Sequence, residues 1–126
     1  MRIEKTHIEI MGSMWTVVSR TNAEDKKLDG ISGYADHTAK MIVLLDEEPD
    51  VNSVSDLHSC LQSTIRHEII HAFLYECGLW ADSNAHEHWA MNEEMVDWFA
   101  LKLPEIQRAC ERVNAMPWQR LSLSQN

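Results

Sequence analysis

The sequence predicts an α+β domain in which a small, twisted, mostly antiparallel sheet packs on two long helices. Over the first 45 residues, apolar side chains alternate with polar ones or form short runs, as they do in strands. From residue 53 onward they recur at helical spacing. The 126 residues and the hydrophobic content of 44% suit one globular domain with one core. We therefore expect a single domain over residues 1–116, followed by a flexible tail over 117–126.

The predicted strands lie in three stretches. Residues 6–19 alternate on both sides of a Gly-Ser break, which indicates a hairpin. A polar stretch over 21–29 follows as a loop or a single helical turn, and a second strand region is expected over 31–35. The continuous apolar run at 41–45 is short enough for a strand, and it ends where acidic residues and Pro49 follow.

Two long helices are expected after the sheet. Either Ser53 or Ser55 can cap the first, and no Gly or Pro interrupts it before Gly78. This spacing gives about six turns. A second helix is expected over 87–103, where Pro104 closes it and then opens a short third helix.

Charge and composition exclude several functions. The formal net charge of −9 argues against a protein that neutralises nucleic-acid phosphates or anionic membranes, so neither partner is expected. The first residues lack the apolar core of a secretory signal, and no later run is long enough to span a bilayer. The three cysteines are widely spaced, which fits reduced thiols in a cytoplasm better than a disulfide framework. We expect a cytoplasmic protein.

An HExxH pattern lies in the middle of the first predicted helix. His67 and His71 are four residues apart, so they project from one helix face, one turn above the other, and can chelate one zinc ion. Glu68 faces the same cleft without reaching the metal, so it can take a proton from a zinc-bound water. Burying two histidines and a glutamate among apolar residues would be costly without a partner. This cost favours a metal site over a chance match.

A third ligand is expected on the second helix, at Glu93. Glu93 and Asp97 lie at positions i and i+4 on one helical face, and a ligating histidine usually needs a carboxylate on its other nitrogen. We therefore expect Asp97 to accept a hydrogen bond from the non-ligating nitrogen of His67. Less well placed alternatives for the third ligand stay open: His86, His88, Glu94 and Cys77.

The two motifs resemble those of the thermolysin-like gluzincins, whose NExxxD motif is matched by Asn92, Glu93 and Asp97. The segment from Glu93 to Ala100 also resembles ImmA/IrrE-like minimal zincins and small phage-encoded HExxH proteins. The likeness covers the element order of residues 30–103 and is specific at the two motifs. It implies a minimal zincin-like fold, a phage or prophage protein, and a Zn²⁺ ion. It also implies an edge strand that borders the cleft and pairs with extended substrate, for which 41–45 is the candidate.

The expected function is that of a zinc-dependent metallopeptidase acting on a peptide or protein substrate. Zinc would polarise the carbonyl, while Glu68 would deprotonate the bound water and later protonate the leaving amine. The alternative is a zinc-binding regulatory or partner-binding module without proteolytic activity. Glu68 favours the enzyme, because a structural zinc site is usually closed by a fourth protein ligand and needs no base. The donor that stabilises the oxyanion stays open among five residues: Tyr34, His37, Tyr75, His86 and His88.

Overall fold

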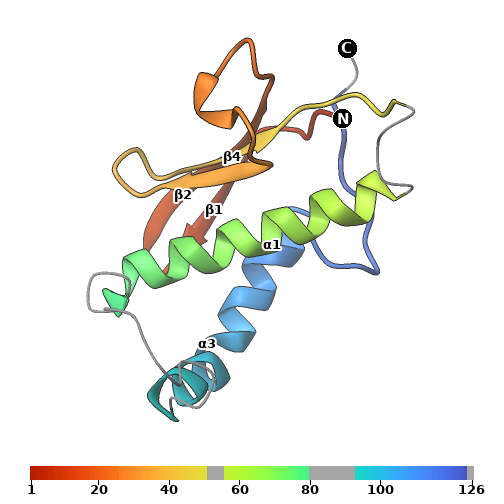
Figure 1. Cartoon of the computed structure of the whole chain (residues 1–126). Coiled ribbons are helices and arrows are strands. Elements are labelled where there is room, and N and C mark those ends of the chain that lie inside the picture. The colour runs from red at the N-terminus through yellow and green to blue at the C-terminus, as the bar shows by residue number, and fades with distance from the viewer. Residues whose placement is uncertain (51–55, 80–92, 125–126) are drawn as a thin grey trace.

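The computed structural model describes residues 1–50, 56–79 and 93–124, and it consists of a four-stranded sheet packed against two helices (Figure 1). This arrangement confirms the predicted α+β class. The strands are β1 (Thr6–Ile10), β2 (Ser13–Arg20), β3 (Gly33–Asp36) and β4 (Met41–Leu45), with a 3₁₀ turn, η1 (Lys26–Leu28), between β2 and β3. The helices are α1 (Leu57–Glu76) and α3 (Glu93–Arg112).

The strand order in the sheet is β1-β2-β4-β3. β1 and β2 form the predicted antiparallel hairpin, whose turn residues Met11 and Gly12 both have positive φ, as a two-residue hairpin turn requires. β3 pairs with β4 in the antiparallel sense, whereas β2 and β4 are parallel. The sheet is therefore mixed but mostly antiparallel.

The expectation that residues 41–45 form the edge strand beside the cleft is wrong, because β4 lies between β2 and β3. A continuous apolar run is typical of a strand that is covered on both faces, and Ile42, Val43 and Leu44 are all buried. The short, half-buried β3 is the edge strand on this side of the sheet.

The main core lies between the sheet and the helices. Apolar side chains from β2 and β4 meet those of α1 there, among them Trp15, Ile42, Ile65, Ile69 and Phe73. Part of the opposite face of the sheet is covered by the connection that contains η1, which lies across the sheet from α1 in Figure 1. Leu28 of η1 is fully buried outside the main core cluster, whereas His7 and Glu9 of β1 are exposed, so this second layer covers only part of the sheet.

α1 confirms the first predicted helix and carries the HExxH pattern. Asp56 caps its N-terminus, where the carboxylate accepts a hydrogen bond from the backbone N–H of Ser59 at 3.0 Å. The predicted caps, Ser53 and Ser55, lie outside the described residues. Gly78, with φ of 83°, follows the helix in the left-handed conformation that commonly ends helices.

α3 departs from the prediction because it continues through Pro104 to Arg112 as one helix. Proline removes one helical hydrogen bond and usually breaks the helix. Packing overrides that preference here, since the residues after Pro104 hold a buried face against the core. Leu103, the last residue of the second predicted helix, is 58% exposed. The buried positions fall one turn later, at Ile106, Ala109, Cys110 and Val113.

Gln62 and Arg66 of α1 hold the segment that follows α3. The buried Nε2 of Gln62 lies 2.7–3.0 Å from three backbone carbonyl oxygens, and the Arg66 guanidinium donates to the carbonyl of Ala115 at 2.6 Å. These bonds satisfy carbonyl groups that no helix or strand pairs. The three carbonyls that Gln62 contacts belong to Asn114, Met116 and Gln119.

The segment after residue 116 makes more contacts than a free tail would, as far as Ser124. Ile3 and Leu123 form a β-bridge, and the N–H of Ser124 donates to the carbonyl of Arg2. Leu121 is buried, and its N–H donates to Nε2 of His58 at 3.1 Å. The predicted domain boundary at residue 116 stays a prediction.

Candidate metal centre

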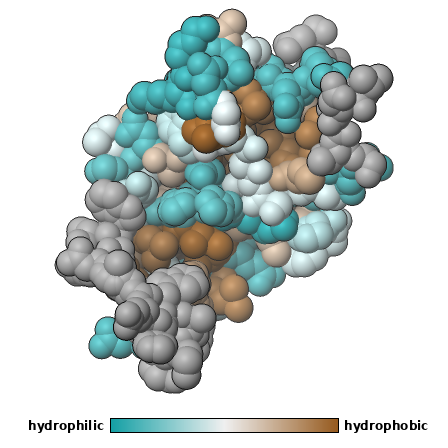
Figure 2. All heavy atoms as spheres, in the orientation of Figure 1, coloured by the Kyte–Doolittle hydropathy of each residue, from teal (hydrophilic) through white to brown (hydrophobic). Residues whose placement is uncertain are grey.

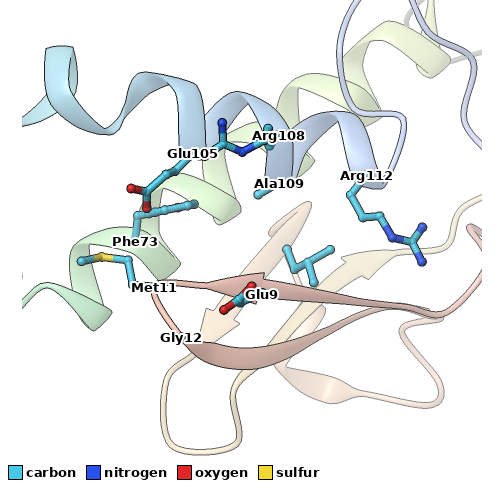
Figure 3. Close-up of a pocket in the computed structure, with 9 residues that line it drawn as sticks. Glu9, Met11, Gly12, Phe73, Glu105, Arg108, Ala109 and Arg112 are labelled. Carbon is cyan, nitrogen blue, oxygen red and sulfur yellow. The ribbon is translucent and has the colours of Figure 1, made fainter.

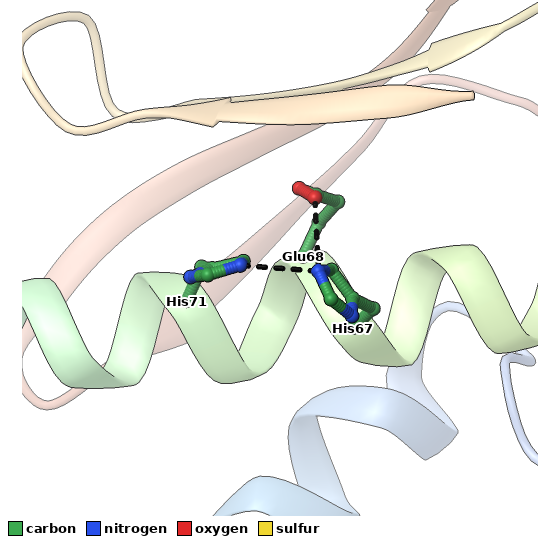
Figure 4. A group of neighbouring side chains, drawn as sticks. All are labelled: His67, Glu68 and His71. Carbon is green, nitrogen blue, oxygen red and sulfur yellow. Dashed lines mark hydrogen bonds and ion pairs between the residues drawn. The ribbon is translucent and has the colours of Figure 1, made fainter. Parts of the chain in front are cut away.

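α1 brings three side chains of the HExxH pattern together: His67, Glu68 and His71 (Figure 4). The Nε2 atoms of the two histidines are 3.1 Å apart, and their rings meet edge to face with centroids 4.7 Å apart. Oε1 of Glu68 lies 3.9 Å from Nε2 of His67. One ligand atom from each residue lies within 4.8 Å of the others, so the group could hold a metal ion.

The two imidazoles fit a metal ion well. Two nitrogens bound to one tetrahedral zinc at about 2.0–2.1 Å are roughly 3.3 Å apart. The observed Nε2–Nε2 separation is 3.1 Å, so a small ring rotation brings both atoms to ligand positions. The side chain of His67 is 67% exposed, which leaves this nitrogen open to solvent and to an incoming ion.

Glu68 differs from its neighbours because it is almost fully buried, with 6% of its surface exposed. Its carboxylate points from α1 toward the sheet (Figure 4). Burial raises the pKa of the Glu68 carboxyl, while the nearby His71 and His67 lower it less strongly. Oε2 has no hydrogen-bond partner among the described residues. A buried carboxylate oxygen of this kind is a ready proton acceptor.

A cleft of about 270 Å³ opens beside this group, between α1 and the edge strand β3. His67 and Glu68 line it together with Ser63 and Thr64 from the preceding turn, and Ser32 and Gly33 from the start of β3. Sequence reasoning missed these four residues. Ser63 and Thr64 could have been found, because they lie four and three positions before His67 on the same helix face. Ser32 and Gly33 could not, since their approach depends on strand order.

Gly33 sets how closely β3 approaches α1. A Cβ atom there would lie 2.9 Å from the carbonyl oxygen of Val43 and 3.3 Å from Cγ2 of Thr64. Only a residue without a side chain fits this gap unless its neighbours shift. The width of the cleft therefore depends on this glycine.

The third ligand is not placed by the described residues. Glu93 begins α3, but its side chain and that of Asp97 lie outside what the structure describes, as do Asn92, His86 and His88. Of the remaining alternatives, Glu94 is exposed, and Cys77 is the C-cap of α1, where its thiol contacts the carbonyl of Leu74 at 3.5 Å. Glu93 as ligand and Asp97 as its supporting carboxylate stay predictions.

Three candidate oxyanion donors lie among the described residues. The Tyr34 hydroxyl donates to the carboxylate of Asp25, and burial followed by this bond raises the pKa of Tyr34 to about 12. Tyr34 is thus engaged away from the cleft. His37 and Tyr75 stack on each other with centroids 4.5 Å apart. Tyr75 lies one turn after His71 on α1, so this pair continues the helix face that carries the histidines.

A larger cavity, of about 390 Å³, lies between β1, the hairpin turn and α3 (Figure 3). Phe73 and Ala109 contribute apolar surface, and Glu9, Arg108 and Arg112 contribute charge. It contains no histidine and shares no residue with the cleft at His67. The candidate metal chemistry therefore belongs to the smaller cleft.

Comparison with known proteins adds no family assignment. No protein-family model, no curated protein and no solved structure matches the chain. Within residues 1–50, 56–79 and 93–124, no helix has the length and hydropathy to cross a membrane. The geometry of the site is therefore the basis on which a function can be inferred.

Proposed function

We propose that the protein is a zinc-dependent metallopeptidase in which His67, His71 and Glu93 bind the metal and Glu68 transfers the proton. One observation carries the proposal: Glu68 is buried beside two imidazole nitrogens that face each other at 3.1 Å, with its Oε1 3.9 Å from Nε2 of His67 and its Oε2 without a hydrogen-bond partner among the described residues. Imidazole and carboxylate ligands suit zinc, among other transition metals. An HExxH site that only stabilised the fold would have no use for the carboxylate of Glu68.

A zinc ion held here would supply a Lewis acid that polarises a carbonyl and lowers the pKa of water. The residues of the chain supply proton transfer and the positioning of the substrate. Glu68 accepts a proton inside the cleft and returns it to the leaving amine. Because its carboxylate is buried, few solvent molecules can form hydrogen bonds with it. The outer edge of β3, unpaired among the described residues, offers backbone groups to an extended peptide. The cleft beside it positions the scissile bond.

Replacing Glu68 with glutamine tests the proposal. The amide keeps the shape of the side chain but cannot accept the proton, so we expect hydrolysis to fall by at least about 100-fold. Zinc content should stay at one ion per chain, because Glu68 is not proposed as a ligand. Metal analysis and a proteomic cleavage screen of the parent and Glu68→Gln proteins measure both quantities.

Three outcomes of this comparison are informative. Loss of zinc in Glu68→Gln would make Glu68 a ligand and contradict its assigned role. Stoichiometric zinc without cleavage by the parent protein would favour the regulatory or partner-binding module. A parent protein that binds no zinc would remove the basis of the proposal.

A further inference from the structure

The cleft at His67 does not end there, because it continues along α1 toward the N-terminus of the helix. A second cavity of about 40 Å³ adjoins it, and the two share Ser32 and Thr64 as lining residues. The lining of the second cavity is more apolar than that of the cleft at His67. Leu45, Leu57 and Leu61 give it an apolar wall, and Met1, Glu47 and the exposed Cys60 also line it.

The contrast between the two cavities is sharp. Next to His67 the lining side chains are hydroxyls and the catalytic candidates, whereas one to two turns earlier the lining gains three leucines from α1 and β4. Figure 2 shows hydrophobic surface in the hollow between the sheet and the N-terminal half of α1. An apolar hollow of this kind, continuous with a polar reaction cleft, is suited to one apolar side chain of a bound ligand.

Size limits which side chain fits. About 10–15 Å³ of such volume is needed for one water molecule, so 40 Å³ accommodates roughly three waters or a side chain of three to four carbons. Valine and leucine meet this limit. An aromatic ring exceeds it, and a carboxylate would lose hydration against the leucines.

Distance fixes the position of that side chain in the ligand. The middle of the lining segment on α1 is between six and seven residues before His67, which corresponds to about 10 Å along the helix axis. An extended peptide covers that distance in roughly three residues at about 3.3 Å each. Alternate side chains point to opposite faces, so the second residue from the metal turns away while the third turns toward the cavity.

We infer that this cavity is a specificity subsite, which accepts a small aliphatic side chain three residues from the carbonyl held at the metal. The inference rests on the proposed function for its metal anchor, but it adds the substrate class: peptides with valine or leucine at that position. Cys60, Leu57 and Leu61 are then specificity residues, six to ten residues before His67.

Peptide hydroxamates test the subsite without hydrolysis. The hydroxamate binds zinc, two alanines act as spacers, and the third residue is glycine, valine, leucine, tryptophan or aspartate, with both chain directions synthesised. Calorimetry on the zinc-loaded protein should give about 10-fold tighter binding for valine or leucine than for glycine, and no gain for tryptophan or aspartate. The same substitutions at the second residue should have little effect.

A protein variant and a chemical probe complete the test. Cys60→Phe should fill the cavity and remove the advantage of leucine, whereas Ser59→Phe, at an exposed neighbour that does not line the cavity, should retain it. In the parent protein, the leucine hydroxamate should slow alkylation of Cys60 by iodoacetamide more than the glycine hydroxamate does. This second measurement does not depend on the folding of a variant.

The outcomes separate the two proposals. Equal affinities across the series, with equal alkylation of Cys60, would overturn the subsite and leave the metal centre intact. Failure of the glycine hydroxamate to bind the zinc-treated protein would overturn the metal centre, and the subsite would fall with it.

Discussion

Glu68 is the residue at which stability and the proposed chemistry conflict most directly. A buried polar atom without a partner costs about 1–3 kcal/mol, and Oε2 of Glu68 has none among the described residues. Native proteins seldom keep such groups, so each calls for an explanation. The proton transfer that we propose for Glu68 would explain this one.

The residues of the HExxH group could be predicted because their proximity is local. Four positions of helix bring two side chains to one face whatever the remainder of the fold does, and His67 and His71 follow that rule. Ser32 and Gly33 reach the same cleft from another element. No local pattern contains that information, because it arises from how the strands are ordered.

Gly33 yields a prediction about the width of the cleft. Gly33→Ala places a Cβ 2.9 Å from the carbonyl oxygen of Val43 in β4 and 3.3 Å from Cγ2 of Thr64 in α1, so β3 must shift relative to these neighbours. We expect the free energy of unfolding to fall by about 1–3 kcal/mol, as in other overpacked sites. Denaturant unfolding measures this, with the exposed neighbour Ser32→Ala expected to change stability by less than about 0.5 kcal/mol. Equal stability of the two variants would show that the gap can widen without cost.

At the scale of elements, the two helices differ in how far the sequence predicts them. α1 has a cap, an uninterrupted interior and Gly78, so its local signals agree with its packing. In α3 the local signal disagrees with the structure, because Pro104 lies inside the helix. The helix persists because Ile106, Ala109 and Cys110 are buried against the core, and that gain is visible only in three dimensions.

α3 also carries the least settled part of the candidate site, and a comparison of variants decides it. Glu93→Ala should reduce zinc affinity far more than Glu94→Ala, because the two side chains are about 100° apart around the helix. Asp97→Ala should cost about 10 to 100-fold in affinity if Asp97 supports a ligating histidine. Competition with a chromophoric chelator gives all three constants. A larger loss of zinc affinity in Glu94→Ala than in Glu93→Ala would show that the helix face of Glu94, and not that of Glu93, lies at the metal.

Glu76 holds the C-terminal end of α1 to the start of β2 and to the turn between β3 and β4. Its carboxylate accepts hydrogen bonds from Lys40 at 2.6 Å, Trp15 at 2.9 Å and Ser13 at 3.0 Å. Burial raises the pKa of Glu76, but these bonds outweigh it, so the pKa lies below its ordinary value. The contribution of Glu76 to stability is therefore present above the ordinary pKa of about 4.5 and is lost as pH falls through the folded value.

Glu76→Gln tests this sign. At neutral pH the variant should unfold more easily than the parent by about 1–3 kcal/mol, because a charged acceptor of three hydrogen bonds is lost. The difference should shrink as pH falls below about 4.5, where the parent also loses the charge. Thermal unfolding over this pH range measures it, with the exposed Glu4→Gln as control. A difference that grows toward acid pH would contradict the assignment.

For the whole molecule, the fold class was predictable but the strand order was not. Hydrophobic periodicity identifies strands and helices one at a time, and it does so correctly for the hairpin and for α1. Because β2 pairs with β4 in the parallel sense, β4 lies inside the sheet and β3 lies at its edge. This order is a property of the assembled sheet. The cleft therefore has β3 as its border, and the edge that we propose to bind peptide is that of β3.

The bonds made by α1 at both of its ends have a kinetic consequence. Gln62 holds the segment after α3, Glu76 holds the start of β2 and the turn between β3 and β4, and Ile69 lies in the core between them. The helix cannot fray from either side without breaking these contacts, so its central amides should exchange with deuterium only when the whole domain opens. Residues 65–73 should then show protection equal to the global free energy of unfolding, and saturating zinc should slow all of them equally. Faster exchange at the histidines than at Ile69 would instead reveal a local opening, in which the metal must order its own ligands.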